Sequence, residues 1–228
     1  MTPLVIVPFH DPAWLANVEA NLCRQTVQAR VVFAVNGKAA DFTSARWQVT
    51  PSGTSHAAAV NAGVEWARDD RDFTHAVLMD SDDYYGPGYL AQALEALKTA
   101  DCCGKRAVYT WLENGLHLFD RVGGRFMGGT LGFNIKKFRP MPAVHQDDTE
   151  WCRAMEESGA VGVDTGPTQY AYVRHGANAH WQANDTIVRK AWGSSRFFPG
   201  ALVHDVNGDP GISFMRPPPS DAEVFEAM

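Results

Sequence analysis

The sequence predicts an α/β fold in which a Rossmann-type, mostly parallel central sheet is flanked by helices. Short apolar runs alternate with amphipathic segments three times in roughly the first 100 residues, a pattern typical of right-handed βαβ units. The apolar runs are almost continuous, as in strands that helices cover on both faces. Each run ends on polar residues, and ligands of such sheets bind at the carboxyl ends of the strands. We therefore expect these strand ends to form one ligand site.

The first strand and helix are expected close to the N-terminus. Residues 4–9, Leu-Val-Ile-Val-Pro-Phe, are typical of a buried strand. Asp11 in the following turn is available as a helix N-cap. Residues 13–24 carry apolar side chains at helical spacing, so we expect them to form a helix. A second strand is expected at residues 30–35, where Asn36-Gly37 stops it.

The third strand is expected to end on an acidic cluster. Residues 53–67 offer a loop and a second helix, and the apolar run at 76–79 follows as the third strand. Asp80-Ser81-Asp82-Asp83 comes directly after this run. Gly86-Pro87-Gly88 then breaks the chain, and residues 89–100 are expected to form the third helix.

The second half of the chain is less regular. Residues 107–112 and 116–119 are expected to pair as strands around Asn114-Gly115, because Asn-Gly is a strong hairpin signal. Beyond Phe197 the chain is rich in Pro and Gly, so residues 197–228 are expected to form a loop-rich tail. The other expected elements are a strand at 130–134, a helix at 146–157 and a strand at 169–173.

The composition is that of a globular protein rather than a disordered or fibrous one. Of the 228 residues, 45% are apolar and 20% are charged. The net charge of -6 gives no general attraction to nucleic acid or anionic membrane. No apolar run approaches the roughly 20 residues that span a bilayer. The four cysteines form no CxxC pair and two are adjacent, which favours a reduced, cytoplasmic protein without structural zinc.

The acidic cluster is a candidate metal site. Alternation along an extended chain places Asp80 and Asp82 on one side. Carboxylates this close together repel one another unless a cation or hydrogen-bond donors offset their charge. Mg²⁺ and Mn²⁺ bind through a few carboxylates plus substrate phosphates, so either ion fits. The alternative is an acidic turn that caps the following helix, and Asp83 is either a second ligand or such a cap.

Taken together, these features resemble the family 2 glycosyltransferases, which have the GT-A fold, over about residues 2–176. The resemblance rests on an ordered set of segments: Val5-Ile6-Val7-Pro8-Phe9-His10-Asp11, Leu22-Cys23-Arg24-Gln25-Thr26, Ala34-Val35-Asn36-Gly37, Ala59-Val60-Asn61-Ala62-Gly63, Leu78-Met79-Asp80-Ser81-Asp82-Asp83, and Asp147-Asp148 with Trp151 and Arg153. The fifth of these looks like the DxD motif of the family. Two positions depart from the family pattern: Asn36 replaces a carboxylate that commonly meets the nucleoside, and Val60 replaces the usual arginine.

The resemblance implies a role for each matched residue. Asp82 is expected to bind the metal, Mn²⁺ or Mg²⁺, with His175 as a further ligand, a role for which His180 competes. Asp148 is expected to be the catalytic base; the alternatives are that Asp147 is the base instead, or that Asp147 and Asp148 only cap their helix. The residues expected to contact the donor nucleotide are Pro8, Phe9, His10, Asp11, Asn36, Asn61 and Asp80. Those expected beside the acceptor or the donor sugar are Asp147, Trp151 and Gly129.

The resemblance therefore implies a metal-dependent, inverting transfer of a sugar from a nucleotide-sugar donor, expected to be a UDP-sugar, to an acceptor hydroxyl. The acceptor is a glycan, a lipid-linked glycan, a protein or a modified nucleic acid. Residues 1–196 are expected to form one GT-A-like catalytic domain, with a nucleotide-binding half at 1–100 and a smaller, mixed acceptor half at 101–196. The alternatives are a non-catalytic nucleotide- or carbohydrate-binding module and a sugar nucleotidyltransferase. The latter class usually has a Gly-rich basic loop after its first strand, whereas residues 8–12 here contain neither glycine nor Lys or Arg.

Overall fold

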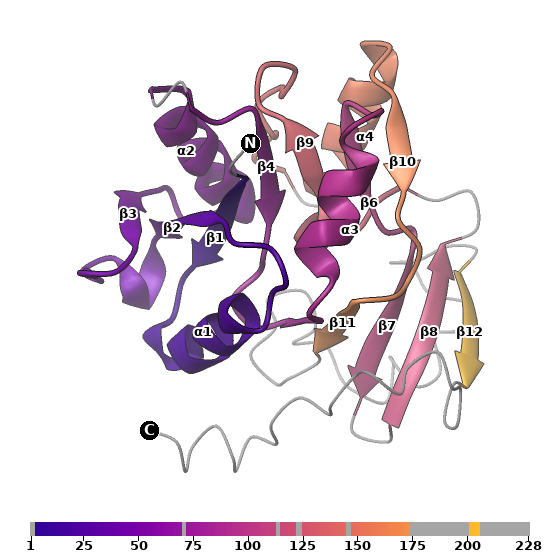
Figure 1. Cartoon of the computed structure of the whole chain (residues 1–228), viewed down its shortest axis with the longest axis horizontal. Helices are drawn as coiled ribbons and strands as arrows, with labels where there is room; N and C mark the ends of the chain where they lie inside the picture. Colours follow the sequence, from indigo (N-terminus) through magenta and orange to yellow (C-terminus); the bar gives the residue numbers. More distant parts are fainter. Residues whose placement is uncertain are drawn as a thin grey trace.

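The computed structural model describes residues 3–69, 72–112, 115–121, 125–144, 147–173 and 201–205. Within these residues the strands form two sheets (Figure 1). The main sheet has the order β10-β6-β9-β4-β1-β2-β3, and the second has the order β12-β8-β7-β11-β5. In the main sheet only β9 is antiparallel to its neighbours. The mostly parallel central sheet and the smaller mixed sheet confirm the fold class predicted from the sequence.

The strands of the main sheet are β1 (Leu4–Phe9), β2 (Arg30–Val35), β3 (Gln48–Pro51), β4 (His75–Leu78), β6 (Cys102–Gly104), β9 (Gly132–Asn134) and β10 (Gly162–Asp164). Those of the second sheet are β5 (Tyr84–Tyr85), β7 (Ala107–Leu112), β8 (Gly115–Arg121), β11 (Tyr170–Val173) and β12 (Ala201–Asp205). The α-helices are α1 (Leu15–Cys23), α2 (His56–Asp69), α3 (Tyr89–Ala96) and α4 (Asp147–Glu157). The short 3-10 helices are η1 (Pro12–Trp14), η2 (Gly37–Ala39) and η3 (Gly128–Thr130).

Helices cover both faces of the main sheet (Figure 1). Leu4 and Ile6 of β1 face a core layer that α2 and α4 close, whereas Val5 and Val7 face the layer of α1 and α3. A Cβ atom on Gly63 of α2 would lie 2.5 Å from Cγ2 of Ile6, so this helix approaches the sheet as closely as only glycine allows. Burial on both faces explains why β1 is an uninterrupted apolar run.

Strands β1 and β4 separate at their carboxyl ends. Strand β1 pairs with β2 over its whole length but pairs with β4 only from Leu4 to Ile6. Pro8 lies beyond the last of these β1–β4 pairs, where its missing N–H leaves no gap in that ladder. The chain winds from β1 to β2 and β3 on one side and returns to β4 on the other, so the two neighbours form a topological switch point. In open α/β sheets this is where ligands bind.

Most elements lie where the sequence predicts them, and the exceptions are short. Strands β3, β6 and β10 and the two-residue β5 were not predicted. Strands β3 and β10 lie at the edges of the main sheet, and their residues are at least partly exposed. Strand β12 lies in the segment that was predicted to be loop-rich, and it pairs antiparallel with β8. Segments this short contain too few residues to establish a strand period, so distant partners decide their structure.

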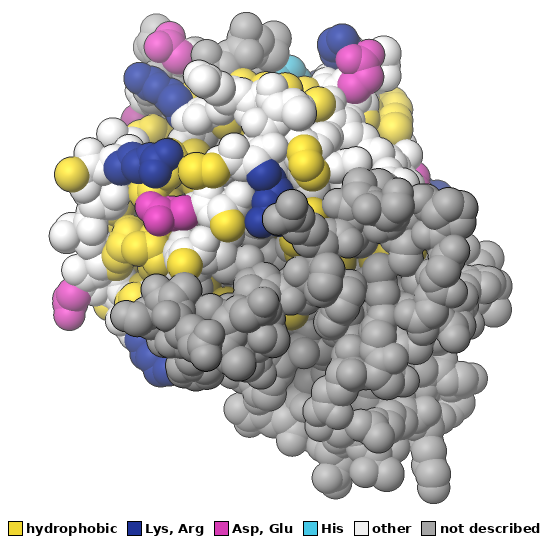
Figure 2. Space-filling view, turned by 60° about the horizontal axis from the view of Figure 1, so that its bottom comes forward, with side chains coloured by type: hydrophobic (Ala, Val, Ile, Leu, Met, Phe, Trp, Pro, Cys, Tyr) yellow, Lys and Arg dark blue, Asp and Glu magenta, His cyan; other side chains and the backbone are white. Residues whose placement is uncertain are grey.

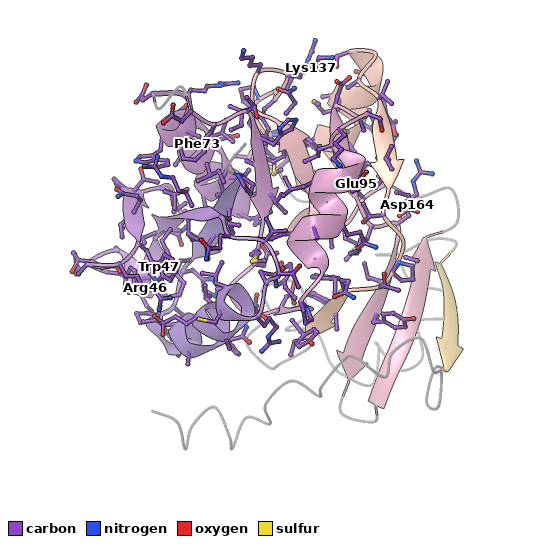
Figure 3. All side chains as sticks on the ribbon, viewed as in Figure 1. Arg46, Trp47, Phe73, Glu95, Lys137 and Asp164 are labelled. Atoms are coloured by element: carbon purple, nitrogen blue, oxygen red, sulfur yellow. The ribbon has the colours of Figure 1, made fainter. Side chains whose placement is uncertain are left out.

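The described surface is of mixed character. On the face in Figure 2, basic, acidic and hydrophobic side chains are interspersed rather than separated into large patches. Arg46 and Trp47 lie together beside β3 (Figure 3), with the guanidinium carbon of Arg46 4.4 Å from the Trp47 ring centroid. All four cysteines are free. Among the described helices, none is both long and apolar enough to cross a membrane.

Lys105, directly after β6, is buried without any exposed surface. Its ammonium group donates hydrogen bonds to Gln92 Oε1 at 2.7 Å, Thr165 Oγ1 at 3.1 Å and the Gly166 carbonyl at 2.8 Å. Three acceptors match the three protons of a lysine ammonium. They connect the end of β6 to α3 and to the loop after β10. Burial lowers the pKa of Lys105 from 10.5 to about 8.

Replacing Lys105 tests this buried connection. We expect Lys105→Met to lower the free energy of unfolding by about 1–3 kcal/mol near neutral pH, because three buried acceptors lose their donor. Between pH 8 and 10.5 the unfolded chain still binds the lysine proton while the folded chain has lost it. Raising the pH through this range therefore stabilises the wild type relative to the variant. Urea unfolding near both limits measures the difference. Lys136→Met, at an exposed site, is the control, and an equal pH response in both variants would contradict the assignment.

Candidate functional site

The candidate site lies at the switch point, where Asp80 follows β4 and His10 follows β1. Asp80 is partly buried, with 23% of its side chain exposed. Its Oδ1 atom lies 3.3 Å from Nε2 of His56 in a contact that becomes an ion pair when the histidine is protonated. Its Oδ2 atom faces η3, where a Cβ atom on Gly129 would lie only 2.6 Å away. Glycine at this position thus lets the backbone approach the Asp80 carboxylate.

His56 is a site residue that the sequence did not reveal. It is the first residue of α2, and the preceding Ser55 accepts a hydrogen bond from the Ala58 N–H as the helix cap. The cap fixes the start of the helix, so His56 points from its first turn towards Asp80. The available signal was the capping serine before a run of small residues, which places the helix start but does not distinguish a site histidine from a surface one.

Asp148 joins the same site from the first turn of α4. Its Oδ2 atom accepts a hydrogen bond from the Gly128 N–H at 3.1 Å, and its Oδ1 atom accepts one from the Thr149 N–H at 2.7 Å. Gly128 and Gly129 are consecutive in η3, so this turn contacts Asp148 with one residue and Asp80 with the next. Two carboxylates far apart in the sequence are thereby brought against two consecutive glycines.

The buried hydroxyl group of Tyr85 connects the Asp80 backbone to Gly129. It accepts a hydrogen bond from the Asp80 N–H at 2.6 Å and donates one to the Gly129 carbonyl at 2.7 Å. Tyr89 lies against Tyr85 and donates to the Leu78 carbonyl at 3.0 Å. Burial raises the pKa of Tyr85 well above its usual value, so its proton stays in place. The end of β4 and η3 therefore share one buried donor and acceptor.

Asp83 has a different role from the other carboxylates of the cluster. It is buried, and its carboxylate accepts hydrogen bonds from the Tyr170 hydroxyl at 2.6 Å and the Val173 N–H at 3.0 Å. Burial raises its pKa most, and the charges of Asp82 and Asp80 raise it further. Asp83 thus attaches the acidic cluster to β11.

These carboxylates could hold a divalent cation only if another ligand completed its coordination shell. The charges of Asp80 and Asp82 raise the pKa of Asp83, so the carboxylates at this strand end repel one another. A cation bound through Asp82 would relieve this repulsion. Within the residues that the structure describes, no three His, Cys, Asp or Glu side chains are grouped to hold a metal by themselves. Oxygen atoms of a phosphate ligand would complete such a shell. The predicted ligand His175 and its competitor His180 lie outside the described residues, as does the side chain of Asp147.

The loops after β1 and β2 lie at the same edge of the main sheet as the acidic cluster. His10 is exposed, and Asp11 caps η1 by accepting a hydrogen bond from the Ala13 N–H. The Lys38 ammonium lies 2.7 Å from Asp11, and its hydrogen bond lowers the pKa of that carboxyl group. The side-chain amide of Asn36 donates to the Gly53 carbonyl at 2.9 Å, which connects the ends of β2 and β3.

Other predicted site residues support the fold around the site. Phe9 and Trp151 have no exposed surface, so their side chains cannot contact a ligand in this structure. Phe9 packs against Phe33, and Trp151 donates to the Arg139 carbonyl. Pro8 is also buried. The Asn61 amide exchanges two hydrogen bonds with the backbone of Met141, at 2.8 and 2.9 Å.

The comparisons with known proteins agree with the fold. Residues 5–158 match the sequence profile of the family described as Glycosyl transferase family 2. The fold is similar to that of a solved 4-diphosphocytidyl-2C-methyl-D-erythritol synthase. The match covers 79% of this chain and 97% of that protein's chain, with 15% identity and a TM-score of 0.56. A mutant of the Drosophila beta-1,4-galactosyltransferase 7, in complex with manganese, UDP-Gal and xylobiose, covers 81% of this chain and 74% of its own, with 15% identity and a TM-score of 0.52. These similarities show the fold. No protein of curated function matches the sequence.

Removing the Tyr85 hydroxyl tests the support of the site. We expect Tyr85→Phe to lower the free energy of unfolding by about 1–3 kcal/mol, because the Asp80 N–H and the Gly129 carbonyl lose their shared partner. Urea denaturation measures the loss. Tyr84→Phe is the matched control, since its hydroxyl lies outside this bridge. Equal effects of the two substitutions would show that the bridge contributes nothing.

Proposed function

The chain belongs to the glycosyl transferase family 2, and we propose that it transfers a sugar from a nucleotide-sugar donor to a hydroxyl group of an acceptor. One observation supports this proposal above the others. Asp80, which follows β4, and Asp148, in the first turn of α4, contact the consecutive residues Gly129 and Gly128. Such a transfer needs groups that bind the donor and another group that accepts the acceptor proton. We assign donor contacts to Asp80 and proton transfer to Asp148.

The donor nucleotide is proposed to bind at the carboxyl ends of β1 and β4. His10 is exposed after β1, Asp11 follows it in the same loop, and Asp80 is partly exposed after β4. Asn36 after β2 is buried, with its side-chain amide on the Gly53 carbonyl, so we propose that it supports this site from below the surface. A UDP-sugar is the proposed donor, in line with the UDP-Gal complex of the galactosyltransferase that shares the fold.

Asp82 is the proposed principal ligand of a divalent cation, Mn²⁺ or Mg²⁺. When bound, this cation would neutralise the charge that develops on the donor diphosphate. The protein's own contribution is to hold Asp82 on a short loop whose next residue, Asp83, is fixed to β11. His175 is the proposed further ligand, and it follows two residues after Val173, whose N–H binds Asp83.

Asp148 is the proposed general base. A base that removes a proton from an attacking hydroxyl must be held in one orientation. Two backbone N–H groups, from Gly128 and Thr149, orient the Asp148 carboxylate, and the side chain remains partly exposed. Attack of the activated hydroxyl on the face opposite the diphosphate inverts the anomeric carbon. Gly129 is proposed to leave room for the donor sugar beside Asp80.

A nucleotidyltransferase is the second candidate, because the erythritol synthase shares the fold. The loop after β1 argues against it, since residues 8–12 contain no glycine and no Lys or Arg to bind a triphosphate. Glycosyl transfer therefore remains the better supported function.

Donor binding is tested by thermal unfolding with nucleotide sugars. We expect UDP-sugars to raise the melting temperature only when Mn²⁺ is present, because the metal links the diphosphate to Asp82. Asp82→Ala is expected to abolish this metal-dependent shift. Equal stabilisation with and without Mn²⁺ would remove the proposed role of Asp82.

Catalysis is tested by removing the proposed base. We expect Asp148→Asn to lower the turnover number about 10²–10⁴-fold, the usual contribution of a general base, while the affinity for the donor is nearly unchanged. Sugar transfer or donor hydrolysis measures turnover. Glu150→Gln on the same helix, where Glu150 pairs with Arg153, is the matched control. Normal turnover of Asp148→Asn would show that another group is the base.

A further inference from the structure

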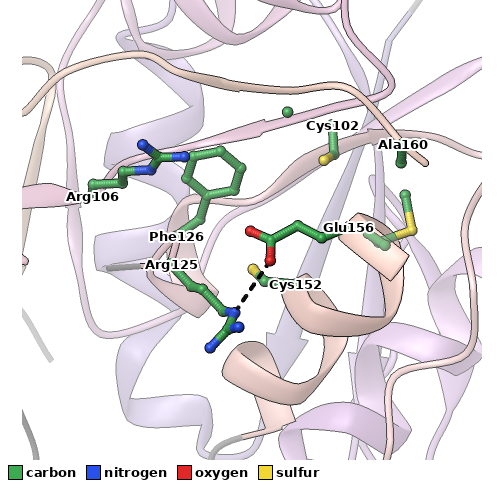
Figure 4. Close-up of a pocket in the computed structure, with 9 residues that line it drawn as sticks. Cys102, Arg106, Arg125, Phe126, Cys152, Glu156 and Ala160 are labelled. Carbon is green, nitrogen blue, oxygen red and sulfur yellow. Dashed lines mark ion pairs between the residues drawn. The ribbon is translucent and has the colours of Figure 1, made fainter. Parts of the chain in front are cut away.

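A cavity of about 210 Å³ opens beside α4, on a part of the molecule that the proposed function does not use. Its walls come from α4, β6, β10 and the segment that precedes η3 (Figure 4). The volume is below the roughly 300–1,000 Å³ of pockets for drug-sized ligands. It therefore suits a small molecule rather than a nucleotide or an oligosaccharide.

The inner wall of the cavity is apolar. The Phe126 ring packs over β6 and β10, where Cβ atoms on Gly104 and Gly162 would lie 2.6 and 3.1 Å from its atoms. Met155 lines the cavity with the thiols of Cys102 and Cys152. Burial raises the pKa of these thiols to about 11 and about 12, so both stay protonated and behave as small apolar groups.

The mouth of the cavity carries two guanidinium groups and one carboxylate. Arg106 lies over the Phe126 ring, with its guanidinium carbon 5.4 Å from the ring centroid. Arg125 pairs with Glu156 at a distance of 3.6 Å between Nε and Oε2, which is longer than a hydrogen bond (Figure 4). The buried Nε of Arg125 makes no hydrogen bond within the described part of the chain. Among the described residues, the mouth thus has an excess of one positive charge.

We propose that this cavity binds a small amphipathic carboxylate, whose apolar body packs against Phe126 and Met155 and whose carboxylate is bound by Arg106 and Arg125. A carboxylate accepts paired hydrogen bonds from a guanidinium group; Arg106 is exposed and the Arg125 side chain is 32% exposed, so a ligand can reach both. Glu156 disfavours a dianion, because its charge leaves the lining with only one excess positive charge.

The cavity is adjacent to the catalytic site but distinct from it. Asp148, Cys152 and Glu156 are spaced by four residues on α4, so they lie along one face of the helix, about 6 Å apart per step. Arg125 and Phe126 belong to the segment that leads into η3. The proposed ligand therefore contacts the two elements that position Asp148, although its binding does not depend on glycosyl transfer.

Binding is tested with hexanoate on the full-length protein, labelled with ¹³C at the methionine methyl groups. We expect hexanoate to shift the Met155 methyl resonance in a saturable way while the resonances of Met79 and Met141, which lie outside the cavity, stay in place. Arg125→Gln and Arg106→Gln are each expected to weaken binding about 10- to 100-fold, the range that a hydrogen bond to a charged group contributes. Hexanol, which lacks the charge, is expected to bind all variants equally weakly.

The matched control is Arg153→Gln, which removes the same charge from an exposed position on α4. Hexanoate binding that is unchanged in this control but weakened in the two arginine variants supports the proposal. No saturable shift of Met155, or equal weakening in all three variants, overturns it. Met79 and Met141 resonances at their wild-type positions show that each variant is folded. None of these readouts involves sugar transfer, so failure here is distinguishable from failure of the proposed function.

Discussion

The site depends on the hydroxyl group of Tyr85. This one group satisfies the N–H of Asp80, where the main sheet ends, and the carbonyl of Gly129, where η3 crosses it. A buried hydroxyl with both its donor and its acceptor engaged extends the link between two segments that also pair through the Leu78 N–H and the Leu131 carbonyl, at 2.8 Å. Gly129 can then approach the Asp80 carboxylate, and Gly128 can bind Asp148. Without the bridge, a buried N–H and a buried carbonyl would each need another partner.

The aspartates of the acidic cluster differ in burial. Asp83 is buried and hydrogen-bonded to β11, while Asp80 and Asp82 remain partly exposed. The neighbouring charges raise the pKa of the buried member. The loop is thereby held firmly by one carboxylate, so that the other two can face a ligand. A sequence of three aspartates within four residues does not reveal which one is buried, because that depends on where β11 lies.

Long and continuous patterns were predicted well from the sequence. Strands β1, β2 and β4 lie within one residue of their predicted bounds, because helices on both faces require continuous apolar runs. The resemblance to a family, rather than spacing, placed Asp80 and Asp148 in one site, and the structure brings both against the glycine pair. The role expected for them stays a prediction.

What the sequence could not reveal depends on contacts between distant residues. Trp151 follows Asp148 by less than one helical turn, but it points into the core, where its position on α4 makes it pack with Phe133 and Phe138. His56 appears in the sequence as a single histidine among alanines, and only the packing of α2 directs it to Asp80. Val60 occupies the position of the family's usual arginine and is buried.

Only the four residues of the acidic cluster and Met79 separate β4 of the main sheet from β5 of the second sheet. The two sheets therefore meet at the carboxylates themselves, and β5 is tied to β11 by pairing as well as through the neighbouring Asp83. A partner that displaced the second sheet would therefore also displace the acidic loop. Because Asp80 is bonded to Tyr85 and Asp83 is bonded to β11, residues inserted between the two aspartates would disturb both attachments.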